Sequence, residues 1–158
     1  DKGEGLYRRS LYTFWKRTAP APVMMSLDAS KREVCTVRRE RTASPLQALV
    51  LMNDPQLVEA ARILGQRLLK KHGDNSAAML AELFRTLTGR HAGKSEKEIL
   101  GRLHAEQLQF FGSNPENAKA FLKTGDAAAD KNLAPAHLAA IGAVANVLLN
   151  FDEAVMKR

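Results

Sequence analysis

The sequence predicts an all-α protein, an irregular bundle of five or six helices preceded by an extended N-terminal arm. Three observations lead to this fold class. Apolar residues recur at helical spacing in successive segments from residue 45 onward. Most of these segments open with a capping residue or a proline and close near a glycine. No two segments show the alternation typical of paired strands.

Length and composition indicate one domain. The 158 residues can bury a substantial core, and the 45% hydrophobic and 26% charged residues are ordinary for a globular protein. We divide the chain into a basic, aromatic arm and connector over 1–44 and a helical bundle over 45–158. The first residue is not methionine, so we expect a C-terminal fragment of a longer protein. No apolar run approaches the roughly 18 residues that a membrane span requires.

The positive charge is concentrated near the N-terminus. Ten basic and five acidic residues lie in the first 45 positions, so this region carries +5 of the total +7. A basic region attracts polyanions such as nucleic acid or acidic polysaccharide, or an acidic partner. Alternatively, its arginines pair with carboxylates elsewhere in a longer parent chain.

The arm allows two conformations. The spacing of four residues between the apolar positions from Tyr7 to Trp15 suits a helix face, whereas the aromatic content suits an extended segment. Aromatic residues interleaved with basic ones can stack on single-stranded nucleic acid. The simpler role for Phe14 and Trp15 is to anchor the arm to the core. Pro20 and Pro22 then predict an extended connector.

The clearest local prediction is a helical corner over residues 44–55. A serine followed three residues later by a glutamine forms a capping box, with proline at the first helical position. An Asn-Asp-Pro sequence then ends the first helix and starts the second. The residues assigned to this corner are Ser44, Pro45, Gln47, Asn53, Asp54 and Pro55.

The same signals predict the remaining helices. They begin near Pro55, Asn75, Ser95, Pro115 and Pro135, and the first three end near Gly73, Gly89 and Gly112. The helix from Ser95 is expected to open with a capping box completed by Glu98 and to carry Ile99, Leu100, Leu103 and Leu108 as its apolar residues.

Three quoted segments carry a family resemblance. RRSLYTFWKRTAPAP (8–22), REVCTVRRERTASPLQALVLMNDPQLVEAAR (32–62) and VLLNFDEAVMKR (147–158) resemble, in order, the C-terminal PSD-one domain. This is a domain of unknown function in planctomycete-type multidomain proteins. The resemblance implies a longer parent in which this domain follows a second domain of unknown function. It also implies a cytochrome C domain in many such parents, and export to the periplasm or cell surface.

No catalytic residues come with the resemblance. The haem attachment pattern Cys-x-x-Cys-His is absent because Cys35 is the only cysteine, so any haem c belongs elsewhere in the parent. We therefore expect no cofactor and no metal in this chain. The turn at 91–93 departs from the proline-containing turn expected of the family.

The residues offer few other chemical candidates. Cys35 could act as a nucleophile activated by neighbouring arginines, but a lone cysteine between valines is more typically a buried apolar residue. The histidines at 72, 91, 104 and 137 lack the close spacing of a metal pair, so we expect solvated or capping roles. Paired carboxylates from Glu59 and the Asp152-Glu153 sequence would depend on the fold.

Five arginines in the N-terminal arm and connector form the main candidate surface, and we expect it to bind an anion or another domain. Its residues are Arg8, Arg9, Arg38, Arg39 and Arg41. Guanidinium groups bind carboxylate, phosphate or sulfate through two parallel hydrogen bonds. The alternative is internal pairing with Glu59, Asp54 or Asp152, or capping of helix ends.

Together these observations predict a non-catalytic accessory or interaction domain of a larger exported, cytochrome-C-associated protein. Its expected partners are the preceding domains of the parent chain. Two alternatives remain: polyanion binding through the basic N-terminal third, and completion of an active site in the preceding domain.

Overall fold

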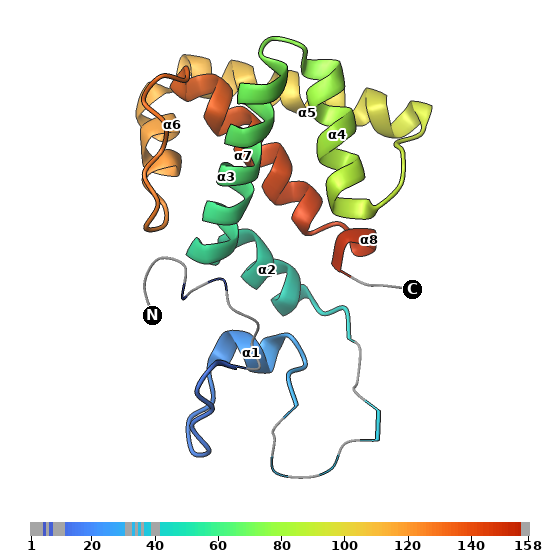
Figure 1. Cartoon of the computed structure of the whole chain (residues 1–158), viewed down its shortest axis with the longest axis vertical. Helices are drawn as coiled ribbons and strands as arrows, with labels where there is room; N and C mark the ends of the chain where they lie inside the picture. The colour runs from blue at the N-terminus through green and yellow to red at the C-terminus, as the bar shows by residue number, and fades with distance from the viewer. Residues whose placement is uncertain are drawn as a thin grey trace.

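The structure, a computed structural model, describes residues 5, 7, 12–30, 33, 35, 37–38 and 42–155. These residues form helices and no strand, which confirms the all-α class (Figure 1). The helices are α1 (Pro22–Ser26), α2 (Pro45–Asn53), α3 (Pro55–His72), α4 (Ser76–Thr88), α5 (Lys94–Ser113), α6 (Pro115–Leu122), α7 (Pro135–Leu149) and α8 (Asp152–Val155). The six from α2 to α7 are the predicted ones, and the short α1 and α8 are additional.

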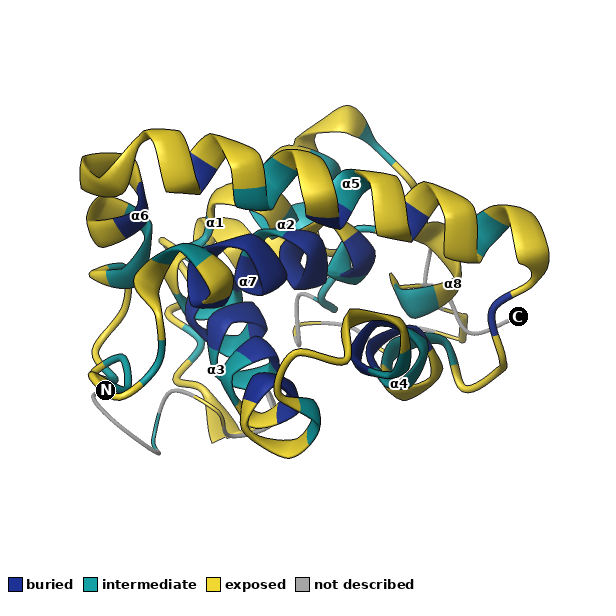
Figure 2. Ribbon diagram, turned by 90° about the horizontal axis from the view of Figure 1, so that it is seen from above, coloured by how far each residue is buried: buried dark blue, intermediate teal, exposed yellow. Residues whose placement is uncertain are grey.

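The core is built where α3 and α7 cross. α7 is buried around most of its circumference, with Ile141 and Val144 fully enclosed, while α5 lies across it (Figure 2). Its run of alanine, valine and leucine suits a helix surrounded by other helices. Gly65 of α3 faces α7 so closely that an added Cβ would lie 3.0 Å from Ile141 Cγ2. The absence of a side chain therefore sets the distance between the two central helices.

The helical corner has the predicted capping geometry. Gln47 N–H donates to Ser44 Oγ at 3.3 Å, and Ser44 N–H donates to Gln47 Oε1 at 2.9 Å. Asp54 Oδ1 accepts from Gln56 N–H at 2.9 Å and so caps α3. Gly73 ends α3 with a φ of 56°, a value that glycine adopts without strain.

The predicted capping box of α5, from Ser95 to Glu98, is wrong by two residues. Gly93 is the N-cap, and Glu96, not Glu98, accepts the cap N–H at 2.7 Å. Arg90 explains the choice because its guanidinium donates to both Glu96 oxygens, at 2.9 and 2.6 Å. Of the apolar residues of this helix, Leu100 is buried, whereas the Ile99 side chain is 55% exposed.

The N-terminal arm differs from its prediction in two places. The expected extended connector contains α1, because Pro22 occupies the first helical position, where its missing N–H is not needed. Phe14 is 85% exposed, so its expected anchoring to the core is wrong, whereas Trp15 is half-buried. The chain turns at Asp28, whose φ is 55°.

Candidate functional site

The predicted arginine surface is described only at Arg38, which is exposed. Arg8, Arg9, Arg39 and Arg41 lie outside the described residues. Two of the carboxylates expected to pair with the arginines have other roles. Asp54 caps α3, and Glu59 accepts hydrogen bonds from elsewhere in the chain.

Asp28 ties the connector to the start of α2. Its Oδ2 atom accepts hydrogen bonds from Thr42 N–H at 2.8 Å, from Thr42 Oγ1 at 2.7 Å and from Gln47 Nε2 at 3.1 Å. These bonds hold the pKa of the Asp28 carboxyl below its ordinary value. The two ends of segment 28–42, which contains part of the arginine surface, therefore meet beside the α2 N-terminus. The sequence identified Gln47 only as a capping residue and missed its second role.

α3 carries a polar stripe that the sequence analysis did not identify. Four residues spaced by three or four positions share one side of the helix. These residues are Glu59, Arg62, Gln66 and Lys70. Arg62 Nη2 donates to the Ala127 carbonyl, Gln66 Oε1 accepts from Asp130 N–H at 3.1 Å, and Lys70 Nζ lies 2.5 Å from Asp130 Oδ2. The stripe thereby holds the long connection between α6 and α7 against α3.

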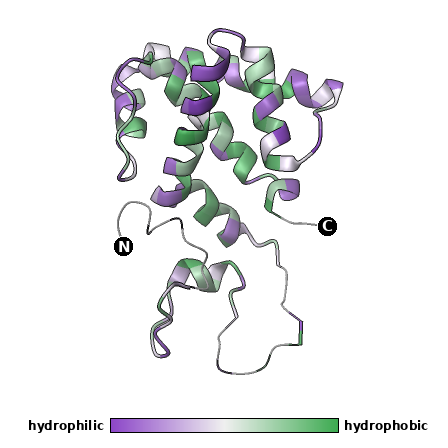
Figure 3. Ribbon diagram, viewed as in Figure 1, coloured by the Kyte–Doolittle hydropathy of each residue, from purple (hydrophilic) through white to green (hydrophobic). Residues whose placement is uncertain are grey.

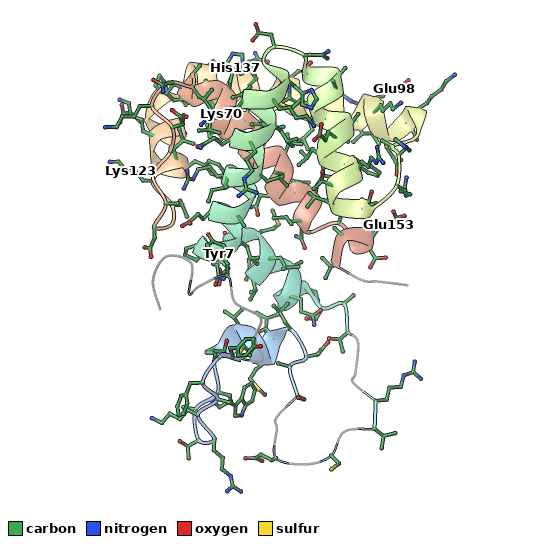
Figure 4. The ribbon with its side chains drawn as sticks, viewed as in Figure 1. Tyr7, Lys70, Glu98, Lys123, His137 and Glu153 are labelled. Atoms are coloured by element: carbon green, nitrogen blue, oxygen red, sulfur yellow. The ribbon has the colours of Figure 1, made fainter. Side chains whose placement is uncertain are left out.

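Glu59 joins this connection to the N-terminal segment. Glu59 is only 3% exposed. Its Oε1 atom accepts from Tyr7 Oη at 2.6 Å, and its Oε2 atom accepts from Asp126 N–H. Figure 4 shows Tyr7 beside the lower end of the helical bundle. Burial alone would raise the pKa of Glu59, but these hydrogen bonds and the nearby Arg62 guanidinium hold it below its ordinary value. Burial and the Glu59 carboxylate raise the pKa of Tyr7 to about 12.

Arg62 is the largest fully buried side chain of the described residues. Its Nε and Nη1 groups have no hydrogen-bond partner among them. The charge of Glu59, one turn earlier on α3, offsets the charge of this guanidinium.

The Glu59 cluster does not have the properties of an acid–base catalyst. A general acid needs a raised pKa, whereas that of Glu59 is lowered. Both carboxylate oxygens are already occupied by donors of this chain. The other expected carboxylate, Glu153, is held by Arg90 Nε at 2.7 Å. The cluster is therefore a structural clasp that joins α3, the N-terminal segment and the α6–α7 connection.

The histidines and the cysteine provide no reactive constellation in the described part of the chain. Cys35 is exposed, so its expected burial is wrong. His104 is 8% exposed, which contradicts a solvated or capping role, and burial together with His137 lowers its pKa. No group of three or more His, Cys, Asp or Glu residues among those described could hold a metal ion. None of the described helices has the length and hydropathy needed to cross a bilayer.

The most unusual surface lies on α2. Among its described side chains only Gln47 is buried, while Leu46, Leu49 and Met52 are 56%, 59% and 45% exposed. These three side chains, spaced by three residues, form what we call the α2 outer face. Figure 3 shows that hydrophobic residues make up most of α2. The contacts of α2 with α7 include polar ones, from Asn146 Nδ2 to Met52 O and from Asn150 Nδ2 to Ala48 O. The helix thus turns polar groups toward the bundle and leaves much of its apolar surface in solvent.

Comparison with known proteins places these features in a family. The sequence model of PSD1, described as "Protein of unknown function (DUF1553)", matches residues 1–104. The chain belongs to this family. The matched part includes α1 to α4, the Asp28 contacts and the α2 outer face, but ends within α5. No curated protein and no solved structure matches the chain.

Proposed function

We propose that this PSD1 domain is a non-catalytic interaction domain that packs against the preceding domain of a longer parent chain. The resemblance of residues 8–22 and 32–62 to PSD-one supports a parent that is exported and associated with cytochrome C. In that parent, any haem c belongs to another domain.

The α2 outer face carries this proposal. A nine-residue helix of largely apolar composition that buries only a glutamine gains little from the hydrophobic effect in the isolated chain. Covering its leucine and methionine side chains would remove apolar surface from water, at about 25 cal/mol per Å². Ten of the fifteen large hydrophobic side chains that are exposed in the described residues lie within the first 53 positions. The apolar surface is therefore concentrated at one end of the chain.

Binding of the separately produced preceding domain tests the proposal. We expect calorimetry to detect a complex with this chain, and Leu49→Lys to weaken it at least about tenfold because a charge enters an apolar contact. Ile99→Lys is the matched control, because it changes an equally exposed apolar residue on α5. Circular dichroism verifies the fold of both variants. Equal binding by wild type and Leu49→Lys, or self-association abolished by Leu49→Lys, would contradict the proposal.

The second candidate function is polyanion binding through the basic N-terminal third. The first 45 residues carry +5, and Arg38 is exposed. Polyanion binding predicts retention on heparin that falls steeply with salt, because each neutralised phosphate or sulfate releases a counterion. Replacing Arg38, Arg39 and Arg41 by Gln should lower the eluting salt concentration. Passage through the column at low ionic strength eliminates this candidate and leaves the first intact.

The third candidate is completion of an active site in the preceding domain. Replacement of Arg39 by Gln in the full-length parent would then abolish activity without unfolding the protein. Unchanged turnover eliminates this candidate.

A further inference from the structure

Two hollows adjoin on the surface of α4. The first, with a volume of about 160 Å³, is an apolar notch between α4 and α5 lined by Ala77, Leu80, Ala81, Leu100 and Gly101, among others. The second is a broader groove of about 470 Å³. Ala81 lines both, so the two hollows form one continuous surface.

Small side chains keep the notch open. Alanine occupies two of its α4 positions, and glycine occupies position 101 in the interior of α5. A Cβ atom at Gly101 would meet nothing within 4 Å, so no packing contact requires glycine there. An apolar cavity of about 150 Å³ is large enough to hold benzene. The notch therefore has room for one aromatic ring or one branched aliphatic group.

The adjoining groove is basic. Its lining includes Lys71, Glu82, Arg85 and His91. Lys71 Nζ lies 2.7 Å from Glu82 Oε1, and His72 Nε2 lies 2.6 Å from Glu82 Oε2, so the Glu82 charge is already offset. The Arg85 side chain is exposed, and its guanidinium has no hydrogen-bond or ion-pair partner among the described residues. Its guanidinium is therefore available to an anion from outside the chain.

The apolar and cationic parts are about one helical turn apart. Arg85 follows Ala81 by four positions on α4, which places the two on the same side of the helix with a rise of about 6 Å. Lys97 lines the notch on the α5 side and adds a second positive charge. A ligand that fills both parts needs an apolar group and an anionic group separated by a few carbon atoms.

We propose that this surface binds a carboxylate that carries an aromatic or branched apolar side group. The apolar group fills the notch, and the carboxylate accepts hydrogen bonds from Arg85. A free organic acid and the C-terminal residue of a peptide share this chemistry. The site is separate from the α2 outer face and does not depend on the proposed interaction function.

N-acetyl-L-phenylalanine is a suitable first probe. We expect millimolar concentrations to shift the backbone amide NMR signals of residues 77–85 and 97–101, at the affinity typical of a small ligand. N-acetyl-L-phenylalaninamide lacks the carboxylate and N-acetylglycine lacks the ring, so each should bind at least about fivefold more weakly. A tetrapeptide ending in phenylalanine distinguishes the sources. Tighter binding of the tetrapeptide indicates a peptide C-terminus, and equal or weaker binding indicates a free acid.

Two pairs of variants locate the site. Gly101→Leu fills the notch and should abolish the shifts, whereas Gly112→Leu introduces the same side chain at another open glycine of α5 and should not. Arg85→Gln removes the free guanidinium and should weaken binding about fivefold, whereas Arg67→Gln changes an exposed arginine of α3 and should not. Absence of shifts, equal binding of the amide probe, or full binding by both site variants would overturn the proposal.

Discussion

At the scale of single residues, the Glu59 carboxylate joins parts of the protein that are far apart in sequence. Tyr7 lies 52 positions before it and Asp126 lies 67 positions after it, and both donate to its oxygens. A carboxylate buried among apolar groups is costly unless donors compensate for the lost water. Glu59 was one of three carboxylates that could have paired with the arginine cluster, but its charged neighbour in the structure is Arg62 of the same helix.

The first prediction concerns the Tyr7 phenol. Burial and the Glu59 carboxylate raise its pKa to about 12, above the ordinary value of 10.0. The variant Tyr12→Phe retains Tyr7 as the only tyrosine, and ultraviolet absorbance should show its ionisation close to pH 12. Glu59→Gln should move that transition toward pH 10, provided that circular dichroism shows a folded protein. Ionisation of Tyr7 at pH 10 in the otherwise unchanged protein would refute the contact.

The raised pKa of Tyr7 also makes the free energy of unfolding depend on pH. Because the folded-state pKa is higher than the unfolded-state pKa, the Tyr7 contact contributes fully below about pH 10. Its contribution is lost as the pH rises from about 10 toward 12.

A second residue-scale prediction concerns Gly125. Its φ is 91°, and a Cβ atom there would collide with the Glu59 side chain. Gly125→Ala should therefore lower the free energy of unfolding by about 2 kcal/mol or more, through backbone strain and loss of the clasp. Gly89→Ala is the control, because its φ of 78° imposes strain but nothing lies within 4 Å, so about 1 kcal/mol is expected. Equal losses in urea denaturation would show that the Glu59 contact adds nothing.

At the scale of helices, Gly65 sets the approach of α3 to α7. A Cβ atom there would lie 3.0 Å from Ile141 Cγ2 and 3.1 Å from the backbone nitrogen of Gly142. Since backbone cannot move aside as a side chain can, Gly65→Ala should cost about 1–3 kcal/mol. Gly101→Ala should instead stabilise the protein by up to about 1 kcal/mol, because it raises helix propensity without a contact. Stabilisation by both variants in thermal unfolding would contradict the close crossing.

The helices were largely predictable because their signals are local. Ser44, Gln47 and Asp54 act within three residues of their own positions. The structure has both the Ser44–Gln47 capping box and the Asp54 cap where the sequence placed them. The local signals gave a wrong prediction at the start of α5, where the sequence fits two overlapping capping boxes. Glu96 and Glu98 both fit a capping box, and Arg90, six residues before Glu96, decides between them by donating to Glu96.

Contacts across the chain were not predictable from spacing. The Asp28 and Glu59 clusters form only because the folded chain brings distant segments together. Asp28 contacts Gln47, 19 positions later, and Glu59 contacts Tyr7, 52 positions earlier. The exposure of the α2 outer face was not predictable from the sequence either. Apolar positions at helical spacing predicted the helix, but not that Leu46 and Leu49 would remain exposed. Of the candidate arginine surface, the structure describes only Arg38, so its role remains a prediction.

At the scale of the whole molecule, ionised carboxylates hold the helices and loops together. Six carboxyl groups in the described residues have pKa values below their ordinary ones: Asp28, Glu59, Glu82, Glu96, Glu116 and Asp130. Glu96 shows the largest shift, to about 2, because Arg90 and the Gly93 N–H donate to it. Arg90 also reaches Glu153 of α8, so one guanidinium connects the α4–α5 turn with the C-terminal helix.

These carboxyl groups predict that the protein loses stability in acid. A pKa lowered by folding stabilises the folded state above the unfolded-state pKa of about 4 to 4.5 and ceases to do so as the pH falls through the folded-state value. Protonation also adds to a net charge that is already +7 near neutral pH, which increases repulsion within the folded chain. The free energy of unfolding in urea should therefore decline steadily from about pH 4.5 to pH 2.

Glu96→Gln tests this prediction at its strongest contact. The variant should be less stable than wild type at neutral pH and should show a flatter decline toward pH 2, because one of the six carboxyl groups that titrate in this range is gone. Glu98→Gln is the matched control, an exposed residue of the same helix turn that should keep the wild-type pH profile (Figure 4). A Glu96→Gln profile parallel to that of wild type would mean that the Arg90 contact does not couple this carboxylate to folding.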